Sequence, residues 1–217
     1  MSTVVVVRHG ETAWTRDGRV QGWAPVPLTE RGRTQARRTG DYLATAFEID
    51  RLVSSDLLRC FETASLINDR LDPAVRFRTD PAWRERDFGL YQGLADRTIG
   101  EVLRPHLESD ASRPNPAPES GPGPLIENTR GESWDDVQRR VLEAWASLVD
   151  SLEGETVAVV THTGPITNLL AEIEGLDPAD PAAVPCDVGS VHVVDVDTDS
   201  DTGPCVVRQN VLEHLRR

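Results

Sequence analysis

Short runs of β-branched residues alternate with longer helical stretches along this chain, and this alternation constrains the fold more than any other feature. The run Thr-Val-Val-Val-Val at 3–7 is typical of a strand that is buried on both faces of a parallel sheet. The alternation predicts an α/β fold, a three-layer α/β/α sandwich with a mostly parallel central sheet and a small cap or loop insertion. Further strands are predicted at residues 51–54, 75–78, 156–161, 188–196 and 205–210, of which the last two are expected near a sheet edge.

Polar residues that cap helices stand between these strands. Thr29 precedes a predicted helix over 30–46, and polar caps of this kind satisfy free backbone N–H groups. Ser133 precedes another helix that ends near residue 152, with Asp136 as its partner in a capping box. Two more helices are predicted. One is capped by Ser55 or Asp56 and runs to about residue 70, and the other starts after Gly164-Pro165, where the proline suits the first turn.

The chain has 217 residues, a length that fits one domain spanning 1–217. Residues 109–131 differ from the rest, because five prolines stand there among few large apolar side chains. A segment so poor in core-forming residues does not make a layer of the sheet. We interpret it as a loop insertion over one end of the domain, either a lid over the site or a solvated excursion.

Acidic residues outnumber basic ones, 36 to 23, which gives a formal net charge of −13. This excess argues against nucleic acid or an anionic membrane as the main partner. No apolar run approaches the roughly 18 residues that a membrane span needs. Three cysteines without close spacing, and no basic leader before a long apolar run, favour the cytoplasm. The oligomeric state stays open between a monomer and a homodimer.

Every basic side chain other than histidine is arginine, because the chain contains no lysine. Together with the acidic excess, this composition indicates either a salt-adapted proteome, as in a halophile, or a GC-rich genome. At molar salt the Debye length falls to about 3 Å, so a dense acidic surface no longer repels itself strongly. The halophile interpretation therefore predicts a fold that molar KCl stabilises.

Charged side chains follow the predicted strands at the points where the strands end. In an open α/β sheet, ligands bind beyond the carboxyl ends of the strands. We therefore expect the side chains at these ends to converge on one crevice. After the first four predicted strands these side chains are, in order, Arg8 with His9, then Arg59, then Glu85, and then His162.

These side-chain types suit phosphoryl transfer. Arginine offers a planar fork of donors that matches phosphate oxygens, and its charge does not titrate away. A neutral imidazole can attack phosphorus and carry the phosphoryl group covalently, and a carboxylic acid can protonate the leaving oxygen. Such a reaction needs little beyond positioning and charge neutralisation. We therefore expect no metal and no cofactor, and the sequence holds no convincing cluster of metal ligands.

Five segments in order resemble the histidine phosphatase superfamily, in its phosphoglycerate-mutase-like branch. The resemblance covers nearly the whole chain except the proline-rich middle and the last predicted strands. A single segment of this kind is a weak signal, whereas five in the right order are specific. The segments are Arg8-His9-Gly10-Glu11-Thr12; Gln21-Gly22 with Pro27-Leu28-Thr29 and Gly32; Ser54 to Ala64; Glu85 to Gly93; and Gly131-Glu132-Ser133 with Val160-Thr161-His162.

The resemblance implies a role for each matched residue. His9 would be the nucleophile that becomes phosphohistidine. Glu85 would protonate the leaving group and then activate water. The transferred phosphoryl group would be held by Arg8, Arg59 and His162, and the implied secondary substrate contacts are Thr12, Gln21, Gly22 and the amide of Thr163.

The sequence favours water as the acceptor of the phosphoryl group. In phosphoglycerate mutases of this family, a lysine beyond the glutamate segment and a later pair of adjacent arginines help to hold a second anionic group. Here Asp96 stands at the lysine position, although Arg97 is next to it, and the later Arg104 and Arg113 are not adjacent to each other. We therefore predict a phosphomonoester hydrolase that acts on a small phosphorylated metabolite. A phosphoglycerate mutase and a non-catalytic phosphate-binding module are the alternatives.

Overall fold

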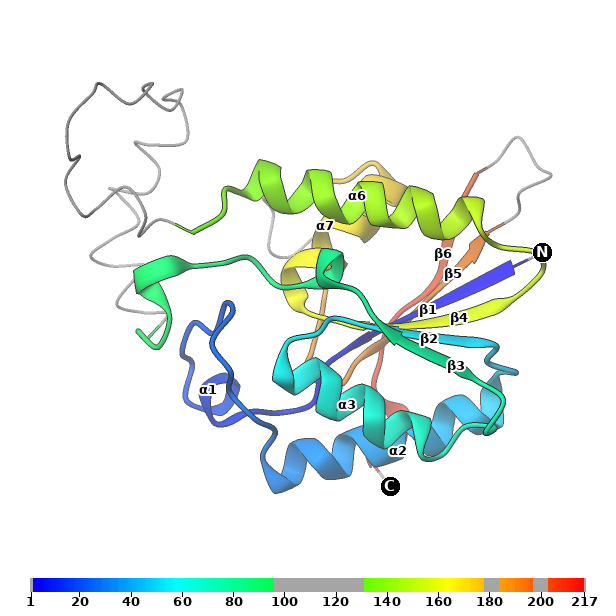
Figure 1. The fold of residues 1–217 in the computed structure, drawn as a ribbon, viewed down its shortest axis with the longest axis horizontal. Helices are drawn as coiled ribbons and strands as arrows, with labels where there is room; N and C mark the ends of the chain where they lie inside the picture. The colour runs from blue at the N-terminus through cyan, green and yellow to red at the C-terminus, as the bar shows by residue number, and fades with distance from the viewer. Residues whose placement is uncertain (1, 96–130, 178–183, 197–202, 217) are drawn as a thin grey trace.

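The computed structural model describes residues 2–95, 131–177, 184–196 and 203–216 (Figure 1). The strands are β1 (Ser2–Arg8), β2 (Arg51–Ser54), β3 (Arg76–Thr79), β4 (Thr156–Thr161), β5 (Val191–Val196) and β6 (Cys205–Val211). The α-helices are α1 (Ala13–Arg16), α2 (Glu30–Ala46), α3 (Leu58–Asn68), α6 (Trp134–Asp150) and α7 (Thr163–Glu174). Short 3₁₀ helices are η1 (Pro81–Trp83), η2 (Gly89–Tyr91) and η5 (Glu213–Arg216).

The described strands form one sheet in the order β3-β2-β4-β1-β5-β6. Neighbours among β3, β2, β4 and β1 run parallel, whereas β5 pairs antiparallel with β1 and β6 pairs antiparallel with β5. In Figure 1, α2 and α3 cover one face of the sheet and α6 and α7 cover the other. The predicted three-layer sandwich with a mostly parallel sheet is therefore confirmed.

The central strand β1 is buried on both faces, as its valine run predicts. Val4 and Val6 pack in one apolar cluster with side chains of α6 and α7, while Val5 and Val7 pack in a second with side chains of α2 and α3. All four valines are 0% exposed. Burying each of them stabilises the fold by about 1.5–3 kcal/mol relative to leaving it in water. Thus β1 joins the two helical layers through one sheet.

The parallel register brings the carboxyl ends of three strands to one edge of the sheet. Arg8 at the end of β1 lies opposite Thr161 at the end of β4. Ser54 at the end of β2 lies opposite Val160. The loops that leave these strands therefore start side by side, which is the arrangement that the expected convergence requires.

The start of α3 differs from its prediction. Ser55 or Asp56 was expected to cap the helix, but the N-cap residue is Leu57, which makes no side-chain hydrogen bond, and the helix begins at Leu58. The Ser55 hydroxyl is engaged elsewhere, because it accepts a bond from the Leu57 N–H at 3.3 Å and lies 2.9 Å from Nε2 of His162. The prediction was wrong because a polar residue at a strand end serves the site here, not the helix.

The other predicted elements lie close to their expected bounds. Helix α7 begins at Thr163, slightly earlier than predicted, and Pro165 lies in its first turn as expected. The capping box of Ser133 and Asp136 is confirmed. Strands β5 and β6 lie near a sheet edge as predicted, with β6 at the edge. The proline-rich insertion at 109–131 falls outside the described residues, apart from Gly131.

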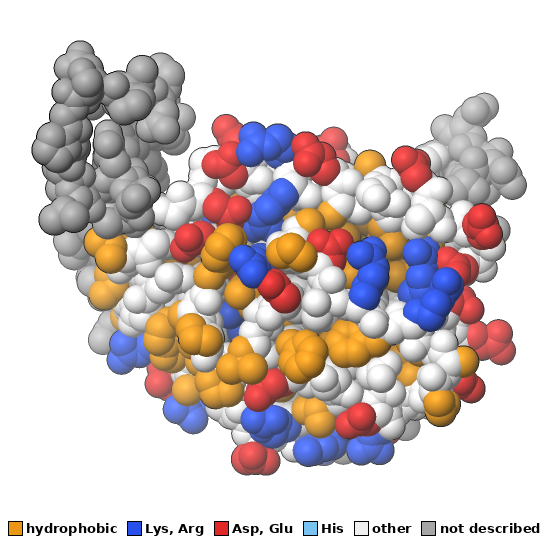
Figure 2. Space-filling view, in the orientation of Figure 1, with side chains coloured by type: hydrophobic (Ala, Val, Ile, Leu, Met, Phe, Trp, Pro, Cys, Tyr) orange, Lys and Arg blue, Asp and Glu red, His pale blue; other side chains and the backbone are white. Residues whose placement is uncertain are grey.

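The surface mixes arginines with acidic side chains (Figure 2). One such pair joins Arg51 to Glu155 at 2.8 Å. Figure 2 also shows hydrophobic side chains over α3 and β3, where Phe61 is 45% exposed and stacks on Phe77. Within the described part of the chain, no helix has the length and apolar character that crossing a bilayer requires.

Candidate active site

His9, which follows β1, is held in one tautomer. Its Nδ1–H donates to the carbonyl oxygen of Gly10 at 2.8 Å, and its Nε2 accepts from Nε of Arg59 at 3.2 Å. Because a carbonyl can only accept and a guanidinium can only donate, the proton lies on Nδ1 and the lone pair lies on Nε2. Burial lowers the pKa of His9 well below 6.5, and the charges of Arg59 and Arg8 lower it further. The ring is therefore neutral at neutral pH and carries a nucleophilic Nε2.

Two glycines let helix α2 pack directly against the loop that carries His9. A Cβ on Gly10 would lie 2.5 Å from the carbonyl oxygen of Gly32, and a Cβ on Gly32 would collide with the backbone of Glu11. The Gly10 N–H donates to Oγ1 of Thr63 at 3.1 Å. These contacts fix the backbone around the imidazole, so that neither glycine tolerates a side chain.

Arg59 lies in the first turn of α3 and is 1% exposed. Its Nη2 donates to the Gly22 carbonyl at 2.8 Å, while its Nε faces His9. Arg8 donates from Nη1 to the Cys186 carbonyl at 2.5 Å, and its buried Nε has no hydrogen-bond partner among the described residues. An unpaired buried donor costs about 1–3 kcal/mol. An anion bound beside Arg8 would satisfy it.

His162 is the N-cap residue of α7 and is 0% exposed. Its ring centroid lies 5.2 Å from that of His9, with the two ring planes at 62°. Burial lowers the pKa of His162 well below 6.5, and the positive charge of Arg59 adds to this effect. Its Nε2 lies 2.9 Å from Oγ of Ser55 and 3.3 Å from Sγ of Cys60. The second imidazole is therefore neutral too and is oriented by α3 and the end of β2.

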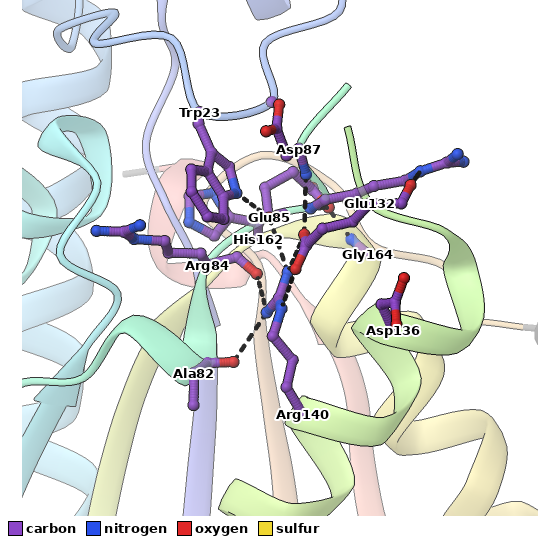
Figure 3. Close-up of polar contacts among 12 residues, drawn as sticks. Trp23, Ala82, Arg84, Glu85, Asp87, Glu132, Asp136, Arg140, His162 and Gly164 are labelled. Atoms are coloured by element: carbon purple, nitrogen blue, oxygen red, sulfur yellow. Dashed lines mark hydrogen bonds and ion pairs between the residues drawn. The ribbon is translucent and has the colours of Figure 1, made fainter. Parts of the chain in front are cut away.

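Glu85 follows η1 and points toward the start of α7 (Figure 3). One carboxyl oxygen accepts from the Arg86 N–H at 2.8 Å, and the other accepts from the Gly164 N–H at 3.2 Å. A Cβ at Gly164 would collide with this carboxyl group, so that the close approach depends on glycine. These two backbone N–H groups keep the carboxyl group beside the pocket.

A cavity of about 390 Å³ joins most of these groups. Thr12 and His162 are fully buried and lie behind the cavity surface. The Thr12 hydroxyl donates to Oε1 of Gln21 at 2.7 Å, so that Thr12 holds a residue that lines the cavity. The described lining residues are Arg8, His9, Thr15, Gly18, Arg19, Val20, Gln21, Gly22, Arg59, Glu85, Phe88, Thr163 and Val188.

The sequence reasoning did not assign Trp23 or Arg140 to Glu85, although both contact its backbone. The Glu85 carbonyl accepts from Nε1 of Trp23 at 2.8 Å and from Nη2 of Arg140 at 2.9 Å (Figure 3). A contact to a backbone carbonyl leaves no motif in the sequence. Arg140 does carry one signal, because it stands three residues after the buried Val137 and four before the partly buried Ala144 on the inner face of α6.

The site combines a neutral nucleophilic imidazole, two arginines and a carboxyl group around one cavity. Side chains of these types can bind a phosphoryl group and attack it. Among the described residues, no group of three or more His, Cys, Asp or Glu side chains could hold a metal ion. The family model described as "Histidine phosphatase superfamily (branch 1)" matches residues 4–208. The chain belongs to the histidine phosphatase superfamily.

Similar proteins carry both phosphatase and mutase names. The chain is 37% identical over 166 residues to "Phosphoglycerate mutase-like protein 4" of Arabidopsis thaliana, covering 76% of this chain and 68% of that protein. It is 32% identical over 178 residues to "Uncharacterized phosphatase PhoE" of Bacillus subtilis (strain 168), covering 82% of this chain and 80% of the relative. Among solved structures, Bacillus stearothermophilus YhfR matches with a TM-score of 0.79 and 32% identity over 99% of this chain and 100% of the other.

Proposed function

We propose that this protein is a metal-independent phosphomonoester hydrolase that acts on a small phosphorylated metabolite through a phosphohistidine intermediate. The observation that carries the proposal is the tautomer of His9. The lone pair lies on Nε2, which accepts from Nε of Arg59, and His9, Arg59 and Glu85 all line the cavity. A binding module has no need for a nucleophile and a proton donor at one cavity.

In the first step, Nε2 of His9 attacks phosphorus and the bond from phosphorus to the ester oxygen breaks. Glu85 in its acid form gives its proton to that oxygen, so that an alcohol leaves instead of an alkoxide. Arg8 and Arg59, which line the cavity, hold the oxygens of the phosphoryl group and neutralise its charge. His162 adds a contact to these oxygens when its ring turns from Ser55 toward the cavity. The products of this step are phosphohistidine, the alcohol and the Glu85 carboxylate.

In the second step, water attacks phosphorus and the bond from phosphorus to Nε2 breaks. The Glu85 carboxylate takes a proton from the water, which returns the carboxyl group to its acid form. Inorganic phosphate then leaves, and the His9 lone pair is free again. Each cycle consumes one water molecule and requires no metal ion or cofactor.

Hydrolysis is favoured over mutase activity because Asp96 stands where the mutases of this family place a lysine. Residue 96 itself lies outside the described residues, so this argument rests on sequence. An acidic side chain there would repel the second anionic group that a mutase must hold. The acidic composition and the free cysteines support a cytoplasmic protein, a monomer or a homodimer, without a nucleic-acid partner.

The proposal predicts hydrolysis of para-nitrophenyl phosphate in the presence of EDTA. The reaction should be measured at low KCl and at molar KCl, because the acidic surface of a halophile protein requires salt. Conversion of 3-phosphoglycerate with a bisphosphoglycerate primer, faster than hydrolysis, would instead establish the mutase. Folded protein without turnover in either salt would establish a binding module. A panel of phosphorylated metabolites then identifies the substrate.

Replacing Glu85 by glutamine is expected to lower kcat/KM for alkyl phosphates by roughly 10²–10⁴-fold, because the amide cannot donate a proton to the leaving oxygen. Binding of inorganic phosphate should change little, since the two arginines remain. Steady-state kinetics and phosphate inhibition measure the two quantities. Glu30→Gln is the matched control, since the Glu30 side chain is 93% exposed on α2. A Glu85→Gln enzyme with unchanged kcat/KM would refute the assignment of the proton donor.

A further inference from the structure

The loop that presents Glu85 is held by a single side chain from α6. Nη1 of Arg140 donates to the carbonyl oxygens of Ala82 at 2.9 Å and Arg84 at 2.6 Å, and its Nη2 donates to the carbonyl oxygen of Glu85 at 2.9 Å. Figure 3 shows the guanidinium group reaching from the helix to these carbonyls. One arginine therefore fixes the main chain at Glu85 and at two positions just before it.

Glu132 fixes the guanidinium group and the far side of the same loop. Its carboxylate accepts from Nε and Nη2 of Arg140 at 2.9 and 2.8 Å, and it also accepts from the Asp87 N–H at 3.0 Å. The Glu132 N–H donates to the Asp87 carbonyl at 2.9 Å, and Nε of Arg86 donates to the Glu132 carbonyl at 2.7 Å. The backbone is thus held both before and after Glu85.

The carboxyl group of Glu85 depends on this support. The hydrogen bonds that its oxygens accept come from two backbone groups, the N–H of Arg86 in the same loop and the N–H of Gly164. No side chain among the described residues holds it by a hydrogen bond or an ion pair. A shift of the main chain at Glu85 therefore moves the proton donor directly relative to Nε2 of His9.

The ionisation state of Glu132 fits its hydrogen bonds with Arg140 and the Asp87 N–H. Burial raises the pKa of Glu132, but hydrogen bonds from Arg140 and the Asp87 N–H outweigh burial and hold the pKa below its usual value. Glu132 is therefore a carboxylate at neutral pH. A bidentate pair of this kind combines charge with fixed geometry, which a lysine at the same position cannot reproduce.

We propose that Arg140, oriented by Glu132, is a positioning residue that places the Glu85 carboxyl group for proton transfer to the leaving oxygen. The inference rests on the proposed hydrolase function. Its neighbour Arg139 provides the contrast, since that side chain is 65% exposed and pairs with Asp136 one turn earlier on the same helix. The contacts of Arg140 concentrate on the loop around Glu85, whereas those of Arg139 do not reach it.

The test compares substrates that differ in their need for a proton donor. Arg140→Lys is expected to lower kcat/KM for an alkyl phosphate such as glycerol 1-phosphate by on the order of 10²-fold, the cost of a misplacement near 1 Å. Para-nitrophenyl phosphate should lose far less, because para-nitrophenolate leaves without protonation. The parameter kcat/KM reports transfer from the substrate to His9, so that slow phosphoenzyme hydrolysis does not hide the effect.

Three further variants complete the test. Glu85→Gln should show the same dependence on the leaving group, and Arg139→Lys should leave both substrates unchanged. Glu132→Gln weakens the ion pair that orients Arg140 without removing Arg140 itself. This variant replaces the Arg140 variant in the test if that variant does not fold. Thermal unfolding of each variant shows how much of the protein is folded under assay conditions.

The outcomes separate the inference from the function that it rests on. Loss of the alkyl phosphate reaction alone, in the Arg140 or Glu132 variant, supports the positioning role. Equal losses for both substrates in folded protein, or no loss, overturn it while the hydrolase stands. A wild-type protein that hydrolyses neither substrate removes the proposed function itself, and the positioning role falls with it.

Discussion

Replacing His9 by alanine is expected to abolish turnover, with a loss on the order of 10⁴-fold or more, because a covalent route without its nucleophile has no substitute group. The neighbouring guanidinium of Arg59 should still attract phosphate, so that binding survives while chemistry stops. The measurement is transfer of labelled phosphate from substrate to protein, trapped by an alkaline quench, since the phosphorus–nitrogen bond of phosphohistidine is labile in acid. Wild-type protein should be labelled, and His9→Ala should not.

The second imidazole, that of His162, allows the experiment to show which of the two histidines is the nucleophile. His162 lies in the same buried pair as His9, with its ring centroid 5.2 Å away, and it is neutral as well. Its Nε2 faces Ser55, whereas Nε2 of His9 faces a cavity-lining guanidinium. Labelling that persists in His9→Ala and disappears in His162→Ala would exchange the two roles. His192→Asn is the control, because His192 is also a buried histidine but lies on β5.

The sheet could be predicted from sequence because its residues leave a strong pattern. Four successive valines suit a strand only where both faces are covered, and the structure covers them with α6 and α7 on one face and α2 and α3 on the other. Helix α2 was predicted with its observed bounds, since Thr29 accepts from the Gly32 N–H as an N-cap residue. Apolar periodicity and capping are local properties, so that a single sequence carries them.

The start of α3 shows a feature that local sequence patterns cannot predict. A serine at the end of a strand has the side chain of a helix cap, and nothing in its neighbours distinguishes the two uses. In the structure, Oγ of Ser55 lies 2.9 Å from Nε2 of His162, which is 107 positions away in the sequence. Such a long-range partner is set by the parallel pairing of β2 with β4, and the sequence shows this pairing only once the sheet order is known.

The site also contains some residues that could be predicted from sequence and others that could not. The groups proposed to touch phosphate stand at strand ends and in short motifs, so that their convergence could be predicted, and the structure brings His9, Arg8, Arg59 and Glu85 to one cavity. The side chains that hold Glu85 could not be predicted by motif, because Trp23 and Arg140 contact a backbone carbonyl that every residue possesses. An arginine on the inner face of a helix is the one signal that points to such a role.

Lowering the pH below 6.5 is expected to destabilise the fold steeply, because buried histidines stay neutral in the folded protein. An unfolded histidine has a pKa near 6.5. Burial lowers the pKa of His9 and His162 well below that value, lowers that of His192 to about 4, and lowers that of His214. Below pH 6.5 the unfolded chain therefore binds more protons than the folded one. The free energy of unfolding is highest above pH 6.5 and falls as the pH drops toward the folded-state values.

Each histidine that stays neutral contributes a slope of about 1.4 kcal/mol per pH unit. His9, His162 and His192 together give at most about 4 kcal/mol per pH unit, a large share of the roughly 5–15 kcal/mol that stabilises a typical domain. Urea unfolding at about pH 7.5, 6.5 and 5.5 in constant KCl measures this slope. Phosphate buffer must be avoided, since a ligand of the folded state would mask the loss. His192→Asn should reduce this slope by about 1.4 kcal/mol per pH unit, the contribution of one histidine. A wild-type slope near zero between about pH 6.5 and 5.5 would show that the buried histidines become protonated in the folded state.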